Sequence, residues 1–105
     1  MTAKLDQHAG QFKALGSPVR LAILRTIVQG AEDGTIVGDI QAKLDIPWST
    51  LSHHLDQLTR TGLIVARREG TFIYHRADIK ILRALTDYLW EDCCKGGKSK
   101  KTSCC

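Results

Sequence analysis

The chain has 105 residues and a formal net charge of +4, which suits one small globular domain. Residues 1–94 are electrically balanced, so the positive excess comes from four lysines near the end: Lys95, Lys98, Lys100 and Lys101. The sequence has no apolar run of about 18 residues and no apolar leader, so we expect a cytoplasmic protein with no membrane partner. It also lacks a phosphate-binding glycine loop, a zinc-hydrolase motif and a nucleophile positioned beside a base, so we do not expect an enzyme.

The first two predicted helices differ in how apolar they are. One spans residues 4–15, ends at Gly16 and has a thin apolar stripe made of Leu5, Phe12 and Leu15. The next begins at Ser17 and Pro18, because serine suits a helix N-cap and proline the first helical position. It has the wide apolar face expected of a central helix, formed by Leu21, Ile23, Leu24, Ile27 and Val28.

A helix-turn-helix pattern follows. Residues 36–44 form a short amphipathic helix, and a turn through Pro47 leads to a second helix that starts at Trp48 and stops at Gly62. Leucines at spacings of four and three mark the buried stripe of this second helix: Leu51, Leu55 and Leu58. Its opposite face is polar, which suits reading of base edges in the DNA major groove. We expect base contacts from Ser49, Thr50, Ser52 and His53, and further DNA contacts from Trp48, Gln57 and Arg60.

Two short β-prone segments come directly after this helix. Residues 63–67 and 71–75 are rich in β-branched and aromatic residues, and residues 68–70 link them with a glycine that can adopt positive φ. This pattern predicts a two-stranded hairpin wing. Its arginines are expected to contact DNA phosphates: Arg67, Arg68 and Arg76.

A last amphipathic helix is predicted from its cap at Asp78 to about Cys94. It carries more apolar surface than one domain needs, which favours a homodimer formed through the first and last helices; the alternative is a helix packed only on its own core. The expected interface is Leu5, Phe12, Leu82, Leu85, Leu89 and Trp90. The predicted fold is therefore a mainly α winged helix-turn-helix with about five helices and a two-stranded wing in residues 1–94, followed by a flexible tail in residues 95–105.

Three segments together resemble the ArsR/SmtB family of bacterial metal-sensing winged-helix repressors. They are LGSPVRLAIL at residues 15–24, STLSHHL at residues 49–55 and LTRTGLI at residues 58–64. The resemblance covers roughly residues 8–90. It implies a homodimer that occupies a palindromic operator in double-stranded DNA and leaves when an inducer binds.

Two inducer sites known in that family do not match this sequence. Where the family has a Cys-Val-Cys-Asp type motif, this chain has Ile36, Val37, Gly38 and Asp39. The family's zinc site on the last helix uses Asp, His and Glu, yet no histidine lies between Asp78 and Cys94, which leaves Asp87 and Glu91 as an incomplete set.

All four cysteines lie near the end of the chain: Cys93, Cys94, Cys104 and Cys105. Thiolates without histidine favour thiophilic ions, and the pattern resembles the arsenic-responsive branch of the family, which has a vicinal cysteine pair just past the last helix. The resemblance implies As(III) or Sb(III) as inducer, with Cys93 and Cys94 as two ligands and Cys104 or Cys105 as the third. Two other sensors stay open: a thiol-redox switch and a sensor of another thiophilic metal.

Overall fold

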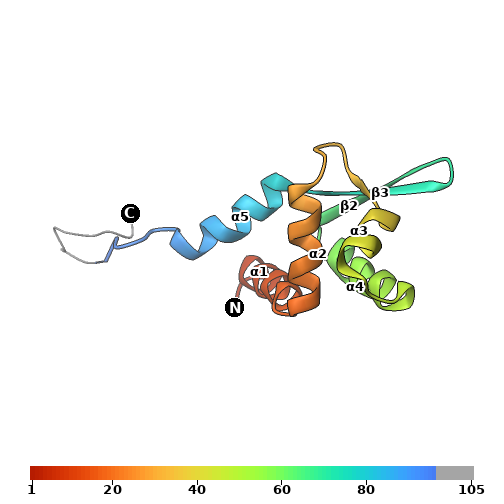
Figure 1. The fold of residues 1–105 in the computed structure, drawn as a ribbon. Helices are drawn as coiled ribbons and strands as arrows, with labels where there is room; N and C mark the ends of the chain where they lie inside the picture. The colour runs from red at the N-terminus through yellow and green to blue at the C-terminus, as the bar shows by residue number, and fades with distance from the viewer. Residues whose placement is uncertain (97–105) are drawn as a thin grey trace.

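The computed structural model describes residues 1–96 and has a winged helix-turn-helix fold, as predicted (Figure 1). Within these residues it contains five helices and three strands. In chain order they are α1 (Ala3–Leu15), α2 (Pro18–Gln29), β1 (Thr35–Ile36), α3 (Val37–Leu44), α4 (Trp48–Arg60), β2 (Ile64–Glu69), β3 (Phe72–Ala77) and α5 (Ile79–Trp90). The predicted tail lies outside the described residues from residue 97 onward. Along residues 1–96, no helix has both the length and the apolar character needed to cross a membrane.

Side-chain caps fix where three of the helices begin. The Ser17 hydroxyl accepts a hydrogen bond from the Arg20 N–H at the start of α2, and the Asp78 carboxylate accepts one from the Ile81 N–H at the start of α5. Both caps were predicted from the sequence. Thr2 caps α1 in the same way. Each cap satisfies a first-turn N–H that has no partner inside its helix.

The sheet has one strand more than the predicted hairpin. Its order is β1-β3-β2, all antiparallel, and the short β1 pairs with the outer edge of β3. The hairpin is also longer than predicted, because β2 continues to Glu69 and pairs there with Phe72. The connection is thus Gly70 and Thr71 instead of residues 68–70, with Gly70 at φ 63°.

The hydrophobic core lies between α2, α4 and the base of the sheet. The predicted α4 stripe is buried, with Leu51 and Leu58 fully inaccessible to solvent. The apolar face of α2 is narrower than predicted, since Leu21 is 44% and Val28 48% exposed. Within residues 1–96, the buried apolar residues are Ala14, Ile23, Leu24, Ile27, Ile40, Leu51, Leu55, Leu58, Leu63, Ile64 and Leu85.

Helix α5 ends at Trp90, earlier than the predicted end near Cys94. Asp92 and Cys94 adopt positive φ, 59° and 62°, and residues 91–96 form turns. A residue in the left-handed region cannot continue an α-helix, so α5 does not extend through Asp92. Cys93 and Cys94 therefore lie in a turn beyond the helix and not on it.

Candidate DNA interface and cysteine pair

The outward face of α4 has the predicted polar composition. Because the leucine stripe points into the core, Ser49, Ser52 and His53 are exposed. Trp48 begins the helix and is 54% exposed. The N-cap residue is Pro47, and no side-chain hydrogen bond caps this helix start. The first-turn N–H groups, which carry the positive end of the helix dipole, thus stay available to a phosphate oxygen beside the hydroxyl groups.

Further along α4, two of the predicted DNA contacts already have intramolecular partners. The Gln57 amide nitrogen lies 3.3 Å from His53 Nε2. Arg60 forms an exposed ion pair with Asp56 at 3.0 Å, one helical turn away. Exposed pairs of this kind are weak, so Arg60 can exchange Asp56 for DNA at small cost. The first turn of α4 is accordingly freer to contact bases than its last turn.

His54 is turned inward and serves the fold. Its Nδ1 lies 3.3 Å from the Arg20 guanidinium, whose Nε also donates to the Ala14 carbonyl. Burial first, and then the charges of Arg20 and His53, lower the pKa of His54. Because a guanidinium can only donate, Nδ1 of His54 is the acceptor and its ring is neutral.

The three wing arginines are divided between the two faces of the hairpin, with Arg67 and Arg76 on one face and Arg68 on the other. Arg67 pairs across the strands with Tyr74 and Arg68 with Ile73, so these neighbouring arginines point to opposite faces. The Arg67 guanidinium lies 4.7 Å over the Tyr74 ring, donates to the Asp33 carbonyl at 3.3 Å and pairs with Glu69. It braces the wing. Arg68 and Arg76 are exposed and better placed to reach phosphates.

A cavity of about 530 Å³ separates the wing from α4. Ser52 and Leu55 of α4 line one side of it, and Ile73 and His75 of β3 line the other. The His75 side chain is buried, and this burial lowers its pKa. The two predicted DNA-contacting elements thus face each other across a mostly apolar gap and are joined through the chain at residues 61–63.

Removing Arg68 tests the predicted role of the wing. We expect Arg68→Ala to weaken binding to operator DNA and to non-specific DNA to a similar extent. The slope of log K against log salt should fall in magnitude by about 1, because one phosphate contact is lost. Fluorescence anisotropy over a salt series measures this slope. Arg83→Ala, which removes an exposed arginine from α5, is the matched control. A changed operator preference with an unchanged salt slope would assign Arg68 to base contacts instead.

The structure brings two of the four cysteines together. The Sγ atoms of Cys93 and Cys94 lie 3.5 Å apart, and the Cys93 N–H donates to the Trp90 carbonyl at 2.9 Å. Asp92 and Lys95 form an ion pair beside them at 3.6 Å. Cys104 and Cys105 lie outside the described residues. Within residues 1–96, no group of three or more His, Cys, Asp and Glu side chains is placed to hold a metal ion.

The predicted dimer residues divide into two kinds. Leu85 is fully buried within the single chain, where it anchors α5 to the core, and it has no area left to bury against a partner. Leu5, Phe12 and Leu82 are partly buried. Leu89 and Trp90, at 61% and 59% exposure, present the large apolar area near the end of α5.

Sequence reasoning missed a buried polar pair between α1 and α5. His8 is 9% and Gln11 2% exposed, and their side chains are hydrogen-bonded at 3.0 Å. A signal was present, because His8 continues the helical spacing of Leu5, Phe12 and Leu15 and thus occupies a position on the buried stripe. Because histidine is polar, His8 was not counted as part of the apolar stripe.

Comparison with known proteins gives consistent matches. Residues 15–67 match a family model described as a helix-turn-helix domain. An uncharacterized HTH-type transcriptional regulator, MJ1325 of Methanocaldococcus jannaschii, is 41% identical over 73 residues, covering 69% of this chain and 79% of the relative. A solved structure from Mycobacterium bovis, the homodimeric winged helix-turn-helix DNA-binding domain of Mb0332, is a possible ArsR-family transcriptional regulator. It is 33% identical with a TM-score of 0.67, over 94% of this chain and 92% of that one.

Two further relatives have names that refer to metal resistance. The putative arsenical resistance operon repressor ArsR2 of Halobacterium salinarum is 36% identical over 61% of this chain and 53% of its own length. The cadmium resistance transcriptional regulatory protein CadC of Listeria innocua is 35% identical over 73% of this chain and 64% of its own length. The chain thus spans less than two thirds of either relative.

Proposed function

Because the chain belongs to the ArsR/SmtB-type winged-helix transcriptional regulators, we propose that it is an arsenic-responsive repressor. It binds a pseudo-palindromic operator as a homodimer, with its two α4 helices about 34–36 Å apart in successive major grooves. Trivalent arsenic or antimony, held by C-terminal cysteine thiolates, releases it. The family consists of DNA-binding regulators and not of enzymes.

The observation that carries the DNA-binding part is the outer face of α4. Its first two turns combine an uncapped helix start with exposed serine and histidine side chains, and an exposed arginine-bearing wing follows it in the chain. The buried leucine stripe holds this face outward. Hydroxyl and imidazole groups select bases, whereas arginines and helix N–H groups bind phosphates and set the position of the protein on the duplex.

The pair of neighbouring cysteines, Cys93 and Cys94, supports the choice of inducer. Two sulfur atoms that bind one ion at about 2.3 Å each can stand no more than about 4.6 Å apart. The Cys93 and Cys94 sulfurs, at 3.5 Å, meet this condition. A soft donor set without histidine favours a thiophilic ion over Mg²⁺ or Ca²⁺. Cys104 or Cys105 would supply the third sulfur, and the short loop needed costs little entropy to close.

The same thiols also support two rival readings. A relative of similar identity is named for cadmium resistance, so another thiophilic metal is the first alternative inducer. Oxidation is the second, because two neighbouring sulfurs can form part of a redox switch.

One titration separates these readings. Operator DNA is first selected from a random duplex library, and the dissociation constant of the reduced protein is then measured with increasing As(III), Cd(II), Zn(II) or hydrogen peroxide. We expect As(III) to weaken binding by about 5- to 150-fold, which is the usual range of allosteric coupling. Release by Cd(II) alone, or by peroxide in the absence of any metal, would replace the proposed inducer.

A further inference from the structure

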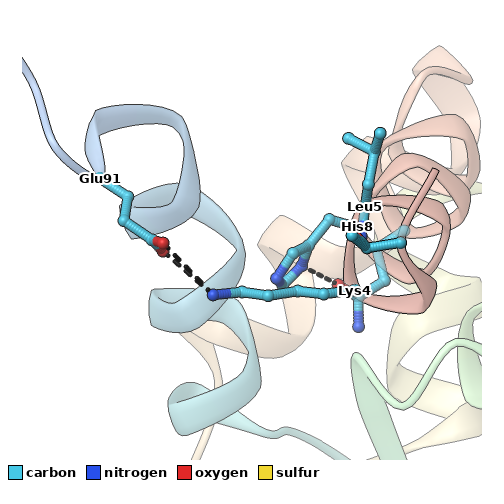
Figure 2. A network of polar contacts seen from close by, with 6 residues as sticks. Lys4, Leu5, His8 and Glu91 are labelled. Atoms are coloured by element: carbon cyan, nitrogen blue, oxygen red, sulfur yellow. Dashed lines mark hydrogen bonds and ion pairs between the residues drawn. The ribbon is translucent and has the colours of Figure 1, made fainter.

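Helix α1 lies against both α5 and α4 and so connects α5 with the recognition helix, α4, which we propose enters the major groove. Figure 2 shows the contacts on the α5 side, where Lys4 reaches Glu91 and His8 lies behind it. The contact to α4 is made by Gln11, one turn further along α1. Its amide nitrogen donates to the Thr61 carbonyl at 3.1 Å. Three side chains of α1 thereby touch elements that are far apart in the sequence.

The hydrogen bonds in this set have a fixed direction. The Thr61 carbonyl can only accept, so the Gln11 amide nitrogen must face it. The Gln11 carbonyl oxygen then faces His8 and accepts from its Nδ1–H at 3.0 Å. Because both side chains are buried, loss of either bond would leave a polar atom without water to replace its partner. The His8 ring and the Gln11 amide can therefore move only together.

Thr61 stands at the junction between the two DNA-contacting elements. It follows the last residue of α4, and its hydroxyl donates to the Leu58 carbonyl at 2.7 Å. Gly62, at φ 81°, turns the chain, and the buried Leu63 leads into β2 of the wing. The Leu63 carbonyl accepts from the Asp78 N–H at the start of α5. A shift of this junction would change the angle between recognition helix and wing.

On the α5 side, these contacts of α1 reach Glu91, two residues before Cys93. The His8 ring packs on Tyr88 of α5 with ring centroids 4.4 Å apart. Lys4 Nζ lies 5.4 Å from the centre of the same ring and 3.2 Å from the Glu91 carboxylate. Glu91 and Tyr88 thus link α1 to the end of α5 that leads into the turn with Cys93.

We propose that Lys4, His8 and Gln11 of α1 form a relay that couples the C-terminal end of α5 to the junction of the recognition helix and wing at Thr61. The inference rests on the proposed function for what the relay transmits, which is occupancy of the thiol site. The ion pair of Lys4 is exposed and its contribution is small. The buried His8 and Gln11 are the positioning residues on which the coupling depends.

The relay is tested first without any metalloid or DNA. Glu91→Lys places a positive charge beside Lys4, and amide hydrogen exchange of residues 61–64 is measured in the reduced protein. We expect the exchange rates there to change by about two- to fivefold, the scale of an exposed ion pair. Asp87→Lys, on the exposed surface of the same helix, should leave them unchanged. In the Gln11→Leu background the response to Glu91→Lys should vanish.

Two more variants distinguish loss of the His8–Gln11 hydrogen bond from a general disturbance of α1. His8→Phe keeps a ring against Tyr88 but removes the bond to Gln11, and it should uncouple the two ends as Gln11→Leu does. Gln7→Leu changes an exposed glutamine of the same helix and should keep the coupling. An equal exchange response in wild type, Gln11→Leu and His8→Phe would overturn the relay.

The second test uses As(III) with operator DNA. As(III) should weaken operator binding in wild type and Gln7→Leu, but by less than about twofold in Gln11→Leu. The loss of titratable thiols on addition of As(III) should be the same in all three proteins. Full release in Gln11→Leu would overturn the relay and leave the proposed inducer intact. If As(III) leaves wild-type DNA binding unchanged, the proposed inducer is wrong, and the exchange measurement still decides the relay.

Discussion

Replacing Leu89 and Trp90 by aspartate is expected to convert the protein into a monomer and to weaken operator binding by at least about 100-fold. These two side chains are the most exposed large apolar residues of α5 (61% and 59%), and Figure 1 shows α5 projecting from the body beside α1. In a two-fold interface the new aspartates of the two subunits would be buried close to each other, and both their desolvation and their mutual repulsion would oppose association. Linked half-sites gain about 10²- to 10⁴-fold in avidity, and a monomer loses that gain.

Light scattering at micromolar concentration and anisotropy on a full and a half operator measure the two effects. Leu21→Asp is the matched control, because Leu21 is a comparably exposed leucine on α2 and should leave both the mass and the affinity unchanged. Circular dichroism reports whether each variant is folded. If the double variant remained a dimer, the interface would have to lie elsewhere than the end of α5.

Periodicity was sufficient to predict the elements that position the DNA interface. The leucines of α4 repeat with the period of a helix, and burying them fixes which side chains point outward without any knowledge of the partner elements. The capping residues Ser17 and Asp78 act within a single turn, so their effect is also readable locally. The wing was predictable for the same reason, because the glycine at its turn and the β-branched strands are neighbours in sequence.

Features that depend on distant partners were missed. Strand β1 has only Thr35 and Ile36, too few residues to show a period, and it exists because β3 offers a free edge. Helix α5 ends where Glu91 adopts an extended ψ of 129°, without a glycine or proline at that point to signal it. The polar His8 and Gln11 lie inside because each satisfies the other, and Thr61, which completes their hydrogen bonding, is 50 residues from Gln11.

Replacing both Cys93 and Cys94 by serine is expected to abolish release by arsenite while keeping operator binding within about twofold of wild type. Both residues lie in the turn after α5 and outside the hydrophobic core, so the fold should tolerate serine, which differs by one atom. A hydroxyl is a hard, weakly acidic ligand and does not replace a thiolate on a thiophilic ion. The wild-type response of about 5- to 150-fold should therefore be lost entirely.

Thermodynamic reciprocity provides a second measurement of the same coupling. If arsenite weakens operator binding by a given factor, operator DNA must weaken arsenite binding by that factor, and the double variant should show neither effect. Cys104→Ser and Cys105→Ser are the matched controls, since each leaves a neighbouring thiol that can act as third ligand. X-ray absorption on the arsenite complex should show three sulfur neighbours. Oxygen or nitrogen in the first coordination shell, or normal release of the double variant, would contradict the assignment of Cys93 and Cys94 as ligands.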